Sequence, residues 1–107
     1  MNIIFKNKKL EKLANDYSHC QKEFGANGAK VFHKRLQALL YADTLEDIRN
    51  MPGRFHELKH NRKGQWACDL EHPYRLVFIP RNDSDSDNKT EIMSVEIQEI
   101  VNYHKEK

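Results

Sequence analysis

The sequence predicts an α+β domain in which two helices pack on a mostly antiparallel sheet. Apolar residues recur at helical spacing in the first half of the chain and alternate with polar residues in the second half. The length of 107 residues corresponds to one domain with one modest core. We therefore expect a single domain over residues 1–107, in the order strand, helix, helix and then four strands (β-α-α-β-β-β-β).

One strand and two helices are expected in the N-terminal half. Residues 1–5 are short, apolar and followed by lysine, which is typical of a strand. Apolar residues from Leu10 to Phe24 recur at helical spacing and predict an amphipathic helix over residues 7–23. The glycines of residues 25–28 should end that helix. We interpret the apolar faces of both helices as core rather than as partner-binding stripes. The apolar face of the second helix is formed by Phe32, Leu36, Leu39 and Leu40.

Four strands are expected in the C-terminal half. Residues 44–48 resemble one helical turn with Thr44 and Asp47 in a capping arrangement, and Pro52-Gly53 marks a turn. Pro80 should end the third of the four strands. Ile100 breaks the alternation of the last strand and should mark a bulge or the end of the strand. The strands are predicted at residues 54–60, 66–70, 74–79 and 91–101, with a turn at residues 63–64 and a polar loop at residues 81–89.

Bulk composition excludes several classes of protein. The sequence contains no apolar run of about 18 residues that would span a membrane. Its N-terminus lacks the features of a secretory signal peptide, so we expect a cytoplasmic protein. Cys20 and Cys68 form neither a disulfide framework nor a Cys-x-x-Cys pair. We expect both to be small, buried and reduced.

Positive charge is concentrated in one segment, although the whole chain carries a net charge of only +2. Residues 51–66 contain four Lys or Arg side chains against the single carboxylate of Glu57. A local basic patch on a nearly neutral protein indicates a defined anionic ligand rather than general adhesion. The basic residues of this segment are Arg54, Lys59, Arg62 and Lys63.

Four fragments carry a resemblance to a known family. Residues 55–66 match the pattern Leu-His-x-Leu-Lys-Gly-x-Arg-x-Gly-x-Trp at every fixed position except the first and the sixth. Residues 74–78 resemble a Tyr-Arg-Ile-x-Phe strand, residues 99–104 resemble an Asp-Tyr-His terminus, and residues 4–11 also fit. In this order along the chain, the fragments resemble the HigB-type killer proteins of the RelE/ParE toxin superfamily.

The sequence departs from the family pattern at several positions. Asn102 stands where the family usually has an aspartate that is thought to help the catalytic histidine, so this departure bears on the proton relay. His60 stands where the family has Gly, and His72-Pro73 replaces an ordinary polar turn. The loop at residues 83–89 is longer than is typical.

The resemblance implies a RelE-like fold and an endoribonuclease toxin of a type II toxin–antitoxin system, which cleaves messenger RNA on the ribosome and so inhibits translation. It also implies a small helix-turn-helix antitoxin of the HigA type as partner. The toxin–antitoxin complex would be oligomeric and would bind operator DNA through the antitoxin. No cofactor is implied.

His56 and His104 are the candidates for acid–base chemistry. Without a metal, RNA is cut when a ribose 2′-hydroxyl attacks the adjacent phosphate, which requires a base and an acid. Histidine suits both proton steps because its unperturbed pKa is about 6.5. Which of the two acts as acid stays open at this point. We expect no metal, because the histidines of the C-terminal half lack tight ligand spacing.

Lys59 and Arg75 are the candidates for contacts to the phosphate in the transition state, since arginine matches phosphate oxygens with its planar fork. Arg75 is the more unusual of the two because it interrupts an otherwise apolar strand. Tyr103 is either a base-stacking residue or an ordinary edge aromatic. Trp66 is interpreted as core. The additional candidates for RNA binding are Arg54, Arg62 and Lys63.

Two alternative functions are kept open. The first is a ParE-like inhibitor of DNA gyrase, because one fold can carry both functions. A gyrase inhibitor needs no acid–base pair, so His56 and His104 favour RNA cleavage over this alternative. The second is an inactive relative that survives as an antitoxin-binding corepressor, an alternative that rests on Asn102.

Overall fold

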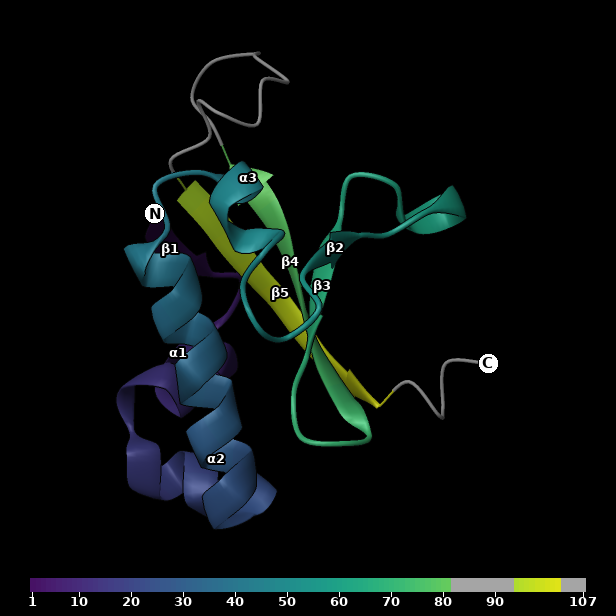
Figure 1. Ribbon diagram of the computed structural model, residues 1–107. Helices are drawn as coiled ribbons and strands as arrows, with labels where there is room; N and C mark the ends of the chain where they lie inside the picture. Colours follow the sequence, from purple (N-terminus) through teal and green to yellow (C-terminus); the bar gives the residue numbers. More distant parts are fainter. Residues whose placement is uncertain (82–93, 103–107) are drawn as a thin grey trace.

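A computed structural model describes residues 1–81 and 94–102. Its strands form one five-stranded sheet in the order β1-β5-β4-β3-β2, in which β1 runs parallel to β5 and the other described pairs are antiparallel. Helices α1 and α2 lie together on one side of this sheet (Figure 1). The predicted α+β class is therefore confirmed. The elements are β1 (Asn2–Phe5), α1 (Lys8–Asn15), α2 (Tyr17–Tyr41), α3 (Leu45–Ile48), β2 (His56–Glu57), a 3₁₀ helix (His60–Arg62), β3 (Trp66–Asp69), β4 (Tyr74–Arg81) and β5 (Ser94–Asn102).

The prediction of one continuous helix over residues 7–23 is wrong, because this segment contains two helices, α1 and α2, that meet at Asp16. The carboxylate of Asp16 accepts a hydrogen bond from the backbone N–H of His19, 3.0 Å away, and thereby caps the start of α2. The break predicted at residues 25–28 is confined to Gly25, whose φ of 80° interrupts α2. Gly28 is helical and buried, and a Cβ there would lie 2.8 Å from that of Phe24. This glycine permits close packing rather than a turn.

The strand predicted over residues 54–60 is reduced to His56–Glu57. Arg54 and His60 both have positive φ, 55° and 60°, so the backbone leaves the extended region on either side of β2. Pro80 does not end β4, which continues to Arg81. Proline is tolerated there because β3 pairs with β4 only as far as Phe78, so β4 has a single neighbour at Pro80.

A bulge does occur in β5, but it lies two residues before the predicted position at Ile100. Val77 pairs with Glu99 while Phe78 pairs with Ile97, which leaves Gln98 as the extra residue. The extra residue restores Ile100 to the core side of the sheet, where it packs on the buried cluster. Of the polar loop predicted at residues 81–89, all but Arg81 lies outside the described residues, as do residues 91–93 of the last predicted strand.

The core lies between the helices and one face of the sheet. Trp66 is 1 % exposed, and Cys20 and Cys68 are fully buried free thiols, as expected. Burial raises the pKa of Cys68 to about 12, so its thiol stays protonated at neutral pH. Leu40 is 54 % exposed, contrary to prediction, because it lies about 100° further round the helix than the buried Leu39. Other fully buried core residues are Phe32, Leu45, Ile48, Leu76, Phe78, Val95 and Ile97.

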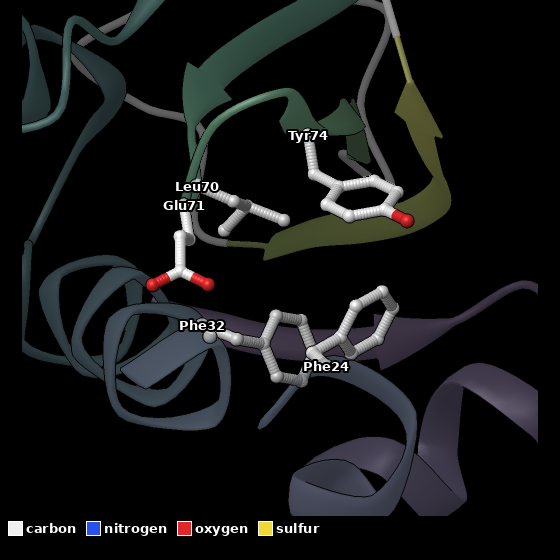
Figure 2. A pocket seen from close by; sticks show the side chains of 6 residues that line it. Phe24, Phe32, Leu70, Glu71 and Tyr74 are labelled. Carbon is white, nitrogen blue, oxygen red and sulfur yellow. The ribbon is translucent and has the colours of Figure 1, made fainter. Parts of the chain in front are cut away.

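A small pocket lies between α2 and the turn that joins β3 to β4. Figure 2 shows Phe24 and Phe32 facing Leu70 and Tyr74 across it, with Glu71 beside them. The rings of Phe24 and Tyr74 meet edge to face, with centroids 5.3 Å apart. The cavity holds only about 10 Å³, which is the space of a single water molecule at most. We interpret it as a packing contact.

Gly53→Ala is expected to lower the free energy of unfolding by roughly 1–3 kcal/mol, the range for backbone strain that the fold must hold in place. Gly53 has a φ of 116°, and an added Cβ would lie 2.5 Å from Nε of Arg35. That Nε donates to the carbonyl of Asp69, 2.7 Å away, while the backbone N–H of Asp69 donates to the carbonyl of Gly53. The alanine would therefore push apart the contacts that anchor the segment before β2. Urea unfolding measures the change.

Gly64→Ala is the matched control for this prediction. Gly64 also has positive φ, 94°, but an added Cβ would meet no atom within 4 Å. It therefore shares the backbone strain without the steric clash, and we expect a smaller loss of stability. Equal losses in the two variants would show that the contact of Gly53 with Arg35 is unimportant.

Candidate active site

One row of residues crosses the sheet face that points away from the helices. His56 on β2 pairs with Ala67, Ala67 pairs with Val77 on β4, and Val77 pairs with Glu99 on β5. The residues before and after Ala67 and Val77 along their strands belong to the core that faces the helices; they are Trp66, Cys68, Leu76 and Phe78. Because side chains alternate along a strand, this row therefore points to the opposite face.

The row places Ala67 and Val77 as a floor between His56 and Glu99. Adjacent strands lie about 4.8 Å apart, so the backbones of His56 and Glu99 are about 14 Å apart. Ala67 and Val77 between them are small, and both are 0 % exposed. Helices α1 and α2 lie on the other side of the sheet (Figure 1).

The ring of His56 is held in a defined orientation by the backbone. Its Nδ1 lies 2.6 Å from the carbonyl oxygen of Arg54. A carbonyl only accepts hydrogen bonds, so Nδ1 must donate, and Nε2 of the neutral ring carries the free lone pair. The positive φ of Arg54, which follows the Pro52-Gly53 turn, brings this carbonyl back toward the ring two residues later. His56 is half-buried and suited to proton transfer through Nε2.

Arg75 lies on the same face, two residues before Val77 on β4 and opposite Asp69 and Val101. Two residues along a strand correspond to about 7 Å, which places Arg75 beside the floor. The residue is half-buried, and its Nε is fully buried. Arg75 can therefore occur in this apolar strand because it points to the face opposite the core, whereas Leu76 and Phe78 point into the core.

The loop after β2 carries the other basic candidates. Lys59 precedes the 3₁₀ helix and is exposed, as is Lys63 just after it. Arg62, from the same 3₁₀ helix, places its Nη2 2.6 Å from Oε1 of Glu99. The loop is therefore tied across the face to β5, at the far end of the row from His56.

The basic segment is more nearly neutral in the fold than in the sequence. Arg54 lies 3.6 Å from a carboxylate oxygen of Asp69, and Arg62 is paired with Glu99. Both carboxylates come from strands outside residues 51–66, so a count of charges along the segment does not include them. Glu57, the acidic residue within the segment, is paired with Arg49 at 2.9 Å.

The remaining histidines of the described residues are not members of the row that contains His56. His33 on α2 contacts the carbonyls of Ala29 and Ala14, each at 3.0 Å, and joins the two helices. His60 and His72 are exposed, and His19 is on α2. Tyr103 and His104 lie outside the described residues, which end at Asn102 beside the row of Arg75.

Two further findings concern ligands and membranes. Within residues 1–81 and 94–102, no group of three or more His, Cys, Asp or Glu side chains is placed to hold a metal ion. A cavity of about 230 Å³ lies between α1, α2 and β5, with neither histidine nor arginine in its lining. None of the described helices combines the length and the apolar character needed to cross a membrane.

The chain matches no known protein family and no curated protein by sequence. Its fold is similar to that of several toxins. A YoeB/ParE toxin from Agrobacterium tumefaciens is 12 % identical, with a TM-score of 0.55 over 94 % of this chain and 96 % of the other. YoeB in a dimer from Staphylococcus aureus is 20 % identical, with a TM-score of 0.55 over 92 % of this chain and 91 % of the other. YoeB in a YoeB–YefM complex from the same species is 24 % identical, with a TM-score of 0.54 over 94 % of this chain and 93 % of the other. The predicted RelE-like topology is confirmed.

Proposed function

We propose that this protein is the toxin of a type II toxin–antitoxin system and a ribosome-dependent endoribonuclease that cleaves messenger RNA. The observation that carries this proposal is the arrangement on the sheet face that points away from α1 and α2. A histidine with its Nε2 available lies in one row with a small apolar floor, and Arg75 lies beside that floor. This face belongs to a fold that is shared with YoeB/ParE toxins.

In the proposed reaction, Nε2 of neutral His56 accepts the proton of the ribose 2′-hydroxyl. The 2′-oxygen then bonds to phosphorus, the bond from phosphorus to the 5′-oxygen breaks, and His104 donates a proton to the leaving oxygen. The products are a 2′,3′-cyclic phosphate and a 5′-hydroxyl. Arg75 and Lys59 stabilise the negative charge on the phosphate oxygens. Tyr103 stacks on a base. No metal takes part in these steps.

The HigB type is proposed on the four sequence fragments that carry the resemblance. The proposed partner is a helix-turn-helix antitoxin of the HigA type, in an oligomeric complex that binds operator DNA through the antitoxin. A complex of YoeB with YefM among the similar structures supports an antitoxin partner in general. The proposed location is the cytoplasm, where ribosomes are found.

A second candidate, gyrase inhibition, is supported by the similarity to a YoeB/ParE toxin. The ordered ring of His56 favours cleavage, because a gyrase-binding protein needs no oriented proton acceptor. Inhibition of gyrase supercoiling by the purified protein, without any RNA cleavage, would favour this second candidate. Absence of both activities would favour an inactive, antitoxin-binding relative, the alternative that rests on Asn102.

Cleavage is expected to depend on the ribosome. Ion pairs engage Arg54 and Arg62, so free RNA would be held by few phosphate contacts at physiological salt. A ribosome would hold the codon in an exposed geometry beside the site. The measurement compares cleavage of naked RNA with cleavage of the same RNA on programmed ribosomes, at about 150 mM salt. Equal rates would contradict ribosome dependence. A chelator of zinc and manganese, with magnesium kept constant, should change neither rate.

A further inference from the structure

Arg62 and Glu99 form an ion pair over the face where RNA is proposed to bind. Their nitrogen–oxygen distance is 2.6 Å, and their side chains are 28 % and 42 % exposed. Glu99 is the β5 member of the row that begins at His56. A fixed negative charge therefore stands on the same surface as the residues that would receive a phosphate.

Carboxylates and phosphates compete for the same donors, because both accept parallel hydrogen bonds from a guanidinium fork. We propose that Glu99 is a specificity-determining residue, the internal counter-ion of Arg62, which single-stranded RNA must displace before its phosphate binds this arginine. The proposal rests on the proposed function, since it assumes that RNA is the ligand of this face. It assigns to Glu99 a role in rejecting free RNA rather than in the chemical step.

The strength of the pair suits an exchangeable contact. Ion pairs that are partly exposed contribute little net stability, so a correctly placed phosphate is able to replace the carboxylate. Free RNA meets Arg62 only at its bulk concentration, whereas RNA held on a ribosome meets it at a much higher effective concentration. Glu99 therefore lowers the affinity for free RNA more than it hinders RNA that is already positioned.

The test measures binding of a non-cleavable, fluorescein-labelled 2′-O-methyl RNA by fluorescence anisotropy over a series of KCl concentrations. Glu99→Gln should bind this RNA roughly three- to fivefold more tightly than wild type, as expected for release of an exposed ion pair. The slope of log K against log[KCl] should become steeper by about 0.7, because the cation released by the phosphate is no longer offset by a cation that the displaced Glu99 carboxylate takes up. Circular dichroism spectra should be those of the wild type.

Glu96→Gln is the matched control. Glu96 lies on the same strand and the same sheet face, and its carboxylate is paired with Arg81 at 3.1 Å. The substitution changes the net charge by the same amount, but further from the floor, beside Ile79. We expect the affinity for RNA to stay within about twofold of wild type, the scale of a screened surface charge.

Arg62→Gln completes a double-mutant cycle. In that background, Glu99→Gln should give no gain in affinity, because the arginine that it would release is absent. An equal gain with and without Arg62, an equal gain in Glu96→Gln, or no binding of RNA by any variant at low salt would each overturn the proposal.

The outcome is separable from that of the proposed function. Failure of the wild type to cleave RNA on ribosomes would reject the nuclease assignment. An Arg62-dependent gain in affinity would still support the exchange at this pair. Conversely, ribosome-dependent cleavage by the wild type with unchanged RNA binding in Glu99→Gln would reject only the role of Glu99.

Discussion

His56→Ala is expected to slow single-turnover cleavage of ribosome-bound messenger RNA by about 10²–10⁴-fold, which is the contribution of one acid–base group. Nδ1 of His56 is fixed on the carbonyl of Arg54, which leaves Nε2 as the proton acceptor. Alanine removes that acceptor while the surrounding strand pairing with Ala67 uses only backbone atoms. The measurement is cleavage of labelled RNA in programmed ribosomes by an excess of protein.

His19→Ala is the control for this experiment. His19 lies on α2, on the side of the sheet away from the proposed site, so its removal should leave the cleavage rate close to that of the wild type. Both variants should give the same circular dichroism spectrum as the wild type. A wild-type rate in folded His56→Ala would show that this histidine transfers no proton.

Arg75→Ala is expected to slow the same reaction by about 10²–10³-fold, as removal of one donor to a developing oxyanion does in other enzymes. Arg75→Lys keeps the charge but loses the planar fork, so an intermediate rate is expected. The half-buried position of Arg75 beside the apolar floor makes its charge more effective than an exposed one.

Arg81→Ala is the matched control, because Arg81 lies on β4 and faces the same side of the sheet. It is exposed and pairs with Glu96 at the far end of the strand. Its loss removes the same charge without touching the floor, and the rate should stay near that of the wild type. Similar losses in the two variants would mean that Arg75 acts only through net charge.

The resemblance, together with local patterns, predicts that His56 and Arg75 belong to one site, and strand pairing places both on one face of the sheet. Side chains alternate between the two faces of β4, which separates Arg75 from the core residues on either side of it. The Pro52-Gly53 turn indicates that a new strand, the one that carries His56, follows it. The pairing of Arg62 with Glu99 was not predictable in this way, because 37 residues separate them. Such a contact depends on the register of three strand pairs, which no local pattern specifies.

Element boundaries were less predictable than the elements themselves. Asp16 divides a segment whose apolar spacing is continuous. Its side chain accepts a hydrogen bond from the backbone N–H of His19 and so caps the start of a new helix. The positive φ values of Arg54 and His60 shorten β2, and neither residue is one that announces such a conformation as glycine does. Both corrections concern individual residues at the ends of elements, and the sheet face that carries the proposed site is unaffected by them.

The parallel pairing of β1 with β5 joins the first and last described strands of the sheet and so bears on when the sheet can form. Asn2 pairs with Ser94, so the sheet cannot close until the chain has been synthesised through β5. Contacts between such distant residues form late and slowly. A nascent chain that has emerged only as far as β4 lacks Glu99, Val101 and the strand that flanks Arg75. The ribosome that makes this protein thus carries an incomplete proposed site during most of synthesis, and an enzyme proposed to cleave messenger RNA on ribosomes is assembled only once its sheet has been translated.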